Sequence, residues 1–519
     1  MVTAVGRSRA LGLVLAGLLL GGCAAGPEWR DSLVPSVAEH RTCLALLTAV
    51  DETVAEAGVT DAAAAPVADF PYLRIDRFLA SFTGELSEAD AFEDWVWRLR
   101  DLDAEARQVE IANLPSEERS ALVRRFTEPH LADAANACGD RLVRSELLSG
   151  REQPRQALLS AAEAPSHYRT VARAMGLYPV TGIGMAIGYA HWQGEHLDSF
   201  TLDYSDSLNH ADAPLRRYEP ALDDVPDAEA VADIVRSVPR SPLGIPALDD
   251  ESLLRLAAHF APVFDIETRS RDDRPGTPYW RQGARDVIPA VDVEHPLAHV
   301  RLAYTRFDEA VLPQIVYTIW FPARPRQHAF DLLGGRLDGV IWRITLGEDG
   351  EPLIHDSIHA CGCYHMFFPV PPVRRVAVPE DDDIREAPLV PAEAPRPAPG
   401  QRLHVQLDDV SHYVTNLGVD GNEVPESRPY ALRLVTQPPE YGARSLALPD
   451  GGRRSLFGPS GIVPHSERRE RFLLWPAGIE SPGAMRQWGT HATAFVGKRH
   501  FDDPYLFQQA FEREEPAAP

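Results

Sequence analysis

The chain has 519 residues, which is enough for about two to four domains and a large hydrophobic core. Its formal net charge of −25 at pH 7 would repel a phosphate backbone, so the composition argues against nucleic acid as a partner. Hydrophobic residues make up 44% and charged residues 24%, which is typical of a globular protein. The 45 prolines exceed the roughly 26 expected from average usage, and they indicate many loops.

The N-terminal segment has the layout of a secretory signal. Arg7 and Arg9 precede an apolar run over 11–20 that is too short to span a bilayer. The segment ends in the residues LGGC at 20–23. This order of basic residues, apolar run, small residues and cysteine resembles the lipobox of bacterial lipoproteins. An ordinary secretory signal with a chance cysteine is the alternative.

The resemblance implies a lipid anchor. Residues 1–22 would be removed as a signal peptide, and Cys23 would become the lipidated first residue of a tether over 23–35. The membrane would then be a partner through this anchor. Ala24 follows the cysteine, whereas Asp at that place often favours inner-membrane retention in lipoproteins of enteric type. The resemblance therefore favours the periplasmic face of the outer membrane within the bacterial cell envelope.

Helical periodicity dominates the first half of the chain. One apolar stripe contains Cys43, a second runs from Trp95 to Val109, and a third contains Cys138. A polar stretch over 196–230 follows. We therefore expect a mainly helical domain over 36–250.

The stretch over 174–192 contains no Asp, Glu, Lys or Arg. Its Gly184 and Gly188 have the spacing that lets another helix approach closely. Pro179 and the glycines interrupt it, so it falls short of the roughly 20 residues of a confident membrane span. We expect a buried helix behind a turn, and a segment that dips into the membrane is the alternative.

Strand patterns dominate from about 262 onwards. Segments rich in β-branched and aromatic residues lie at 299–307, 314–323, 339–358, 402–417 and 430–437. Prolines indicate an irregular insertion at about 369–400. The predicted fold class is α+β, with the helical N-terminal domain followed by a mostly β, largely antiparallel domain over 251–519 with long proline-rich loops.

The cysteines allow one simple pairing. If Cys23 carries lipid, four cysteines remain in an oxidising compartment. Cys43 and Cys138 lie on apolar helical faces of one domain, so we predict a disulfide between them, with two free buried thiols as the alternative. Cys361 and Cys363 are separated by one glycine, and they could form a strained disulfide or a pair of metal-bound thiolates.

The sequence HDSIHACGCYH at 355–365 is dense in potential metal ligands. In an extended strand at about 3.3 Å per residue, the α-carbons of His355 and His359 would lie roughly 13 Å apart. His355 is therefore the weaker candidate for a shared metal ion. The residues that alternate at spacing two, and that zinc or copper would accept, are His359, Cys361, Cys363 and His365. A disulfide between the two cysteines, with histidines in nearby polar positions, is the rival.

Positive charge gathers near the C-terminus of this acidic chain. The residues are Arg486, His491, Lys498, Arg499 and His500. Such a patch could bind an anionic substrate or a lipid headgroup, or it could pair with nearby carboxylates.

No established catalytic motif is present, including the nucleophile elbow, the zinc-protease helix, the phosphate-binding loop and the dinucleotide fingerprint. Apart from the lipobox, no family of known activity is recognised. We therefore predict an envelope lipoprotein with a binding or structural role and a protein or envelope component as partner. A metal-dependent hydrolase or metal-handling protein, and a thiol–disulfide redox protein, are the alternatives, so the question of enzymatic activity stays open.

Overall fold

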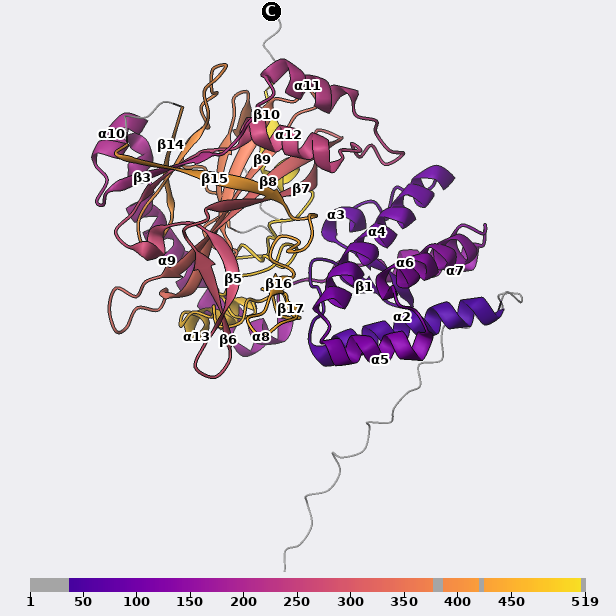
Figure 1. Cartoon of the computed structure of the whole chain (residues 1–519). Helices are drawn as coiled ribbons and strands as arrows, with labels where there is room; N and C mark the ends of the chain where they lie inside the picture. Colours follow the sequence, from indigo (N-terminus) through magenta and orange to yellow (C-terminus); the bar gives the residue numbers. More distant parts are fainter. Residues whose placement is uncertain (1–36, 377–385, 420–423, 515–519) are drawn as a thin grey trace, which may run out of the picture.

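A computed structural model describes residues 37–376, 386–419 and 424–514 (Figure 1). The α+β class is confirmed, because a helical body comes first and a body built on a large β-sheet follows. The lipobox-like segment and the tether, residues 1–35, lie outside the described part. Within that part, no helix combines the length and the apolar character needed to cross a membrane.

The helical body packs against a short hairpin, β1 (Ala65–Val67) and β2 (Phe70–Ile75). Its helices are α2 (Val37–Ala57), α3 (Arg77–Ala80), α4 (Ala89–Asn113), α5 (Ser116–Phe126), α6 (Leu131–Leu142) and α7 (Glu152–Ala161), with a π-helical turn η1 (Val143–Leu147) after α6. Along α4 the buried residues Trp95, Leu99 and Ala106 keep the three-to-four-residue spacing of one helix face. This face packs with the hairpin in the core of the body.

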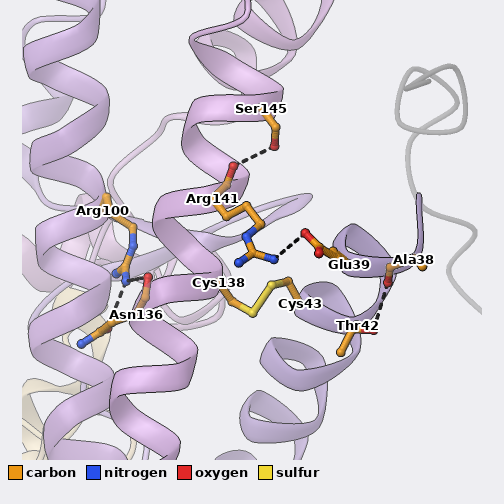
Figure 2. The surroundings of a disulfide bond; sticks show 9 residues. All are labelled: Ala38, Glu39, Thr42, Cys43, Arg100, Asn136, Cys138, Arg141 and Ser145. Atoms are coloured by element: carbon orange, nitrogen blue, oxygen red, sulfur yellow. Dashed lines mark hydrogen bonds and ion pairs between the residues drawn. A yellow bond between two sulfur atoms is a disulfide. The ribbon is translucent and has the colours of Figure 1, made fainter. Parts of the chain in front are cut away.

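A disulfide joins α2 to α6. Cys43 and Cys138, the two cysteines paired by the sequence argument, are bonded with their Cα atoms 5.0 Å apart (Figure 2). An ion pair of 2.9 Å between Arg141 and Glu39 links the same two helices at the surface. The apolar faces of α2 and α6 thus contact each other at the two cysteines.

The second body is organised by a ten-stranded sheet with the order β11-β10-β9-β8-β7-β15-β3-β4-β13-β14. These strands are β11 (Met366–Pro369), β10 (Pro352–His359), β9 (Gly335–Leu346), β8 (Ala310–Arg324), β7 (Leu297–Phe307), β15 (Glu426–Leu434), β3 (Leu215–Pro220), β4 (Val263–Glu267), β13 (His404–Leu407) and β14 (Val414–Gly418). The pairs β15–β7, β15–β3 and β13–β4 are parallel, and the other pairs are antiparallel.

The two faces of this sheet are covered differently. One face forms the main core with α11 (Ala228–Ser237) and α12 (Asp250–Phe260), and there Tyr317 donates a hydrogen bond of 2.8 Å to the carbonyl oxygen of Ala257. Strand side chains alternate between faces. Val300 therefore faces this core, and its neighbours in β7 face the segment after β15, which covers the opposite side. The central strands are buried on both faces for this reason.

The predicted boundary at 250 needs correction. Strand β3 lies inside the expected helical domain, yet it belongs to the large sheet between β15 and β4. The helices before it are α8 (Thr170–Met175), α9 (Tyr178–His196) and α10 (Tyr204–Asn209), with a 3₁₀ turn η2 (Asp198–Thr201). Tyr178 donates a hydrogen bond of 2.8 Å to the carbonyl oxygen of Phe495, so α9 packs on the C-terminal segment. The parallel partner of β3 lies far along the chain, beyond the reach of local periodicity.

Shorter elements complete the second body. They are η3 (Arg271–Asp273), β5 (Thr277–Gln282), β6 (Val287–Asp292), β12 (Val373–Arg375), β16 (Leu446–Ala447), β17 (Arg453–Arg454), α13 (Arg471–Leu474), η4 (Trp475–Ala477), α14 (Leu506–Ala510) and β18 (Phe511–Arg513). The expected irregular insertion at about 369–400 contains β12, which pairs with β18. Residues 377–385 of this insertion lie outside the described part.

Polar contacts join the two bodies. Arg77 forms an ion pair of 2.7 Å with Asp502. The side chain of Gln487 donates a hydrogen bond of 2.9 Å to Asp61, and Asn113 donates one of 2.8 Å to the carbonyl oxygen of Arg444. The segment that covers the second face of the sheet is thereby tied to the helical body.

Candidate functional site

The sequence at 355–365 forms the end of β10 and the tight turn that leads into β11. The backbone N–H of Gly362 donates to the carbonyl oxygen of His359 at 2.7 Å, and that of His359 donates to Cys363 at 3.0 Å. Gly362 has a φ of 89°, and an added Cβ would lie 2.9 Å from the carbonyl oxygen of Ala492. The turn between the two cysteines therefore requires glycine.

Cys361 and Cys363 are unpaired, buried thiols. A hydrogen bond with Cys361, and then burial, raise the pKa of the Cys363 thiol well above its usual range. Metal binding and rapid disulfide exchange both require thiolates, whereas this environment favours the protonated form. The surroundings of the pair therefore favour neither of these chemical roles.

His359 belongs to a buried chain of histidines and aspartates. Its Nε2 atom donates to the carbonyl oxygen of His412 at 3.1 Å, and its Nδ1 atom lies 3.6 Å from Asp338. His412 lies 3.0 Å from Asp338 and 3.6 Å from Asp273. Burial lowers the pKa of His412, but its contacts with these two carboxylates outweigh burial and raise it. These hydrogen bonds and ion pairs therefore hold the loop that contains His412 against the ends of β9 and β10.

His365 has a different partner. Its Nε2 atom donates to Asp356 at 2.8 Å, and Asp356 also accepts hydrogen bonds of 2.8 and 2.7 Å from Arg343. Burial lowers the pKa of His365 to about 3, so the ring is neutral near pH 7. The three side chains lie inside the protein and bind one another, whereas the Nδ1 atom of His365 is buried without a hydrogen-bond partner.

The expected metal site is not assembled. The predicted ligands are His359, Cys361, Cys363 and His365. One histidine contacts Asp338 and the other contacts Asp356. Nowhere in 37–376, 386–419 or 424–514 do three or more His, Cys, Asp or Glu side chains form a group that could hold a metal ion. Alternation at spacing two aligns side chains only while a strand continues, and the turn at Gly362 ends the strand.

The cationic residues near the C-terminus do not form one patch. Arg499 is 1% exposed and forms an ion pair of 3.0 Å with Glu386. The Nε2 atom of His500 accepts a hydrogen bond of 3.3 Å from the backbone N–H of His167, and Lys498 is exposed. The two remaining members, Arg486 and His491, lie together at a cavity.

This cavity has a volume of about 50 Å³ and lies between the second face of the sheet and the segment after β15. Side chains of β7, β8 and β9 form its floor, and residues from 435–491 form its roof. Its basic lining consists of His299, Arg301, Arg444, Arg486 and His491. Its aromatic lining consists of Trp320, Phe457 and Trp488. We call it the cationic cavity.

Two guanidinium groups of the cationic cavity lack a carboxylate partner. Within the described ranges Arg301 has no hydrogen-bond or ion-pair partner, and its guanidinium lies 5.6 Å from the centre of the Trp488 ring. Burial, and then repulsion from Arg444, lower its pKa to about 10, so it stays charged near pH 7. Arg486 donates to backbone carbonyl groups, including that of Cys361 at 3.1 Å. Neither guanidinium therefore forms an ion pair with a carboxylate of the described residues, although Glu105, Asp61 and Asp76 act on Arg301 from a distance.

The two histidines of the cationic cavity are neutral near pH 7. Burial, and then Arg433, lower the pKa of His299 to about 4. Burial, and then Arg486, lower the pKa of His491 to about 3. The Nε2 atom of His491 donates to the carbonyl oxygen of Ala360 at 3.2 Å, whereas its Nδ1 atom is buried without a hydrogen-bond partner.

A larger cleft of about 240 Å³ lies between the two bodies. Its charged side chains already satisfy one another or the backbone, because Arg77 pairs with Asp502 and Asp76 accepts a hydrogen bond of 2.8 Å from the backbone N–H of Leu79. This cleft joins the bodies, and its Arg77 and Asp502 side chains are committed to each other. The cationic cavity is therefore the better candidate.

No family model matches the chain, and no characterised protein or solved structure matches it. The candidate site therefore rests on geometry. The sequence argument singles out Arg486 and His491, but it misses Arg301 and Arg444. Alternation in β7 places His299 and Arg301 on one face, which is the one local signal that points to them.

Proposed function

We propose that the chain is a lipid-anchored binding protein of the bacterial cell envelope. Its ligand is a small oxyanion, or the anionic end of a larger molecule, held in the cationic cavity. The lipobox-like segment at 1–23 supports the location. The chemistry of the cavity supports the class of ligand.

One observation carries the proposal: Arg301 and Arg486 line one cavity and neither has a carboxylate partner among the described residues. Arg486 is buried and Arg301 is partly buried. Withdrawing such a charge from water without a counter-ion costs free energy, and a bound anion would offset part of that cost. The other arginine of the lining, Arg444, shows the contrast, because it forms ion pairs with Glu105 and Asp61. Arg301 and Arg486 are thus the two arginines of the lining that form no ion pair with a described carboxylate.

The dimensions suit a small anion. A volume of about 50 Å³ corresponds to about two water molecules at their share of roughly 30 Å³ each, which limits the ligand to a small oxyanion or a terminal carboxylate. A guanidinium presents two parallel N–H groups to such oxygens. Thr318 also lines the cavity, and its hydroxyl can donate a further hydrogen bond.

Thermal unfolding of the unlipidated chain 24–519 tests the ligand class. Phosphate, sulfate and acetate are compared with chloride at constant ionic strength. At least one oxyanion should raise the unfolding temperature in a concentration-dependent way. Isothermal titration calorimetry should show that one anion binds per chain. Arg301→Gln should abolish the effect, whereas Arg285→Gln, at an exposed position outside the cavity, should retain it. Equal responses in both variants would overturn the proposal.

The location is tested separately. In a bacterial host, the parent chain should incorporate labelled fatty acid and sediment with the outer-membrane fraction. Cys23→Ser should lose the label and appear in the soluble periplasmic fraction. An unlabelled parent chain would contradict the anchor and leave the test of the cavity unaffected.

A further inference from the structure

Helices α8 and α9 expose an unusual number of aliphatic side chains. Each of these residues is between 61% and 73% exposed: Val171, Met175, Leu177, Val180, Ile183 and Ile187. Soluble proteins rarely display a contiguous apolar surface of this kind without a partner. The stretch over 174–192, which the sequence singles out for its lack of charge, contributes most of it.

The orientation of α9 is fixed by its other side. Tyr178 and Trp192 face the protein, where Tyr178 donates to the carbonyl oxygen of Phe495 and the Trp192 ring packs on Tyr364 at 5.0 Å between centroids. Residues 180, 183 and 187 follow helical spacing on the opposite side. Gly184 lies on that outer side with no atom within 4 Å of a Cβ placed there. The aliphatic side is therefore the face that α9 presents outwards.

The apolar face continues onto α13 and η4. Phe472, Leu473 and Trp475 are 67%, 62% and 40% exposed. Contacts hold this segment against α8, because the backbone N–H of Arg169 donates to the carbonyl oxygen of Gly478 at 2.7 Å. The labels of α8 and α13 also lie at the same end of the second body in Figure 1. We call the combined surface of α8, α9, α13 and η4 the apolar face.

Positive charge accompanies the apolar face. Lys498 is exposed and follows Gly497, whose carbonyl oxygen accepts a hydrogen bond of 2.6 Å from Arg173 of α8. Arg469 precedes α13, is exposed, and has no carboxylate partner in the described part of the chain; its guanidinium donates to the carbonyl oxygen of Ala329. Aromatic and basic side chains beside an aliphatic surface suit the boundary between acyl chains and anionic headgroups.

We propose that the apolar face rests on a bilayer surface with anionic headgroups, with α9 parallel to the membrane plane. The inference extends the membrane attachment of the proposed function, and it is independent of the cationic cavity. A lipid anchor alone limits how far the protein can move from the membrane. Contact through the apolar face would also fix the orientation of the protein relative to the membrane. The aliphatic residues of α9 would enter the acyl boundary, and Arg469 and Lys498 would contact headgroup phosphates.

Vesicle sedimentation of the unlipidated chain 24–519 tests this proposal without the anchor. The vesicles contain phosphatidylethanolamine and phosphatidylglycerol, and pure phosphatidylcholine vesicles serve for comparison. The parent chain should sediment with the anionic vesicles. Val180→Asp combined with Ile187→Asp should weaken partitioning at least about tenfold, because two charges would enter the acyl boundary. Val225→Asp, at an exposed apolar position before α11, is the matched control.

Each outcome decides one part of the proposal. Loss of binding in the double variant, with an unchanged unfolding temperature and normal binding by the control, supports the apolar face. Lys498→Gln combined with Arg469→Gln should weaken binding to the anionic vesicles alone. Failure of the parent chain to bind either vesicle overturns the proposal. A concentration-dependent dimer that the double variant abolishes also overturns it, because a second copy would then cover the face. A failed Cys23 labelling experiment changes none of these results.

Discussion

Arg301 and Arg343 lie in register on one face of the sheet, with Val316 of β8 between them. Arg343 is held by two hydrogen bonds to Asp356, whereas Arg301 has no carboxylate partner among the described residues. Equivalent positions on β7 and β9, the two strands that flank β8, thus carry one arginine with a carboxylate partner and one without. The difference separates a structural arginine from one that is available to a ligand.

Replacement of these two arginines should have opposite consequences. Arg343→Met leaves Asp356 buried without its cation and should lower the free energy of unfolding by about 3–5 kcal/mol. Arg301→Met removes an unpaired charge and should leave the ligand-free stability unchanged or higher. Urea denaturation in a chloride buffer measures both. Arg285→Met is the surface control, and a shift within about 0.5 kcal/mol is expected there. A loss for Arg301→Met as large as that for Arg343→Met would show that Arg301 is structural.

The buried histidine of the cationic cavity should make stability depend on pH. Burial lowers the pKa of His299 to about 4, from an ordinary value of 6.5. Below pH 6.5 the unfolded chain binds a proton that the folded chain refuses, so this group costs stability as the pH falls towards 4. The slope reaches about 1.4 kcal/mol per pH unit. His299→Gln should therefore unfold less steeply with acid than the parent chain.

Urea midpoints between pH 6.5 and 4.5 measure this difference. Groups that titrate in both chains contribute equally to the two pH slopes, so the difference between the slopes reports His299 alone. His210→Gln, at an exposed position, should keep the parental slope. A parental slope in His299→Gln as well would mean that His299 takes up its proton at the same pH in the folded and the unfolded chain, which contradicts the lowered pKa.

Local periodicity explains what the sequence could predict of the fold. The hairpin of β9 and β10 follows from alternating side chains and the turn at Gly350, where φ is 84°. The disulfide between Cys43 and Cys138 follows from cysteines on apolar helix faces within one body. Strand β3 was beyond this approach, because its neighbours β15 and β4 lie later in the chain and one pairing is parallel.

The candidate site was less accessible to prediction. Alternation shows that His299 and Arg301 share a face, but it does not show that residues 435–491 close over that face. It also does not show which arginines reach a carboxylate, since Arg444 meets Glu105 of the helical body. The four predicted metal ligands do not come together in the described residues for a related reason, because the position of a turn decides whether alternating side chains remain aligned.

The disulfide in the helical body should be a major source of its stability. Cys43 and Cys138 are separated by 95 positions, and closing a loop of that length in the unfolded chain is worth about 4–5 kcal/mol in the chain-entropy model. The double variant Cys43→Ala and Cys138→Ala should lower the free energy of unfolding by this order. Reductant should destabilise the parent chain similarly and leave the double variant unchanged. Cys361→Ala with Cys363→Ala is the control that keeps sensitivity to reductant.

The remaining two cysteines should behave as inert thiols. In the native chain 24–519 a thiol reagent should react slowly, because Cys361 and Cys363 are each 7% exposed and the pKa of the Cys363 thiol is raised. Unfolding without reductant should release two reactive thiols per chain, while the other two cysteines stay bonded. Zinc content should not change in Cys361→Ser combined with Cys363→Ser. Stoichiometric zinc that this variant loses would restore the metal hypothesis, and the absence of thiols after unfolding would instead establish a bond between the pair.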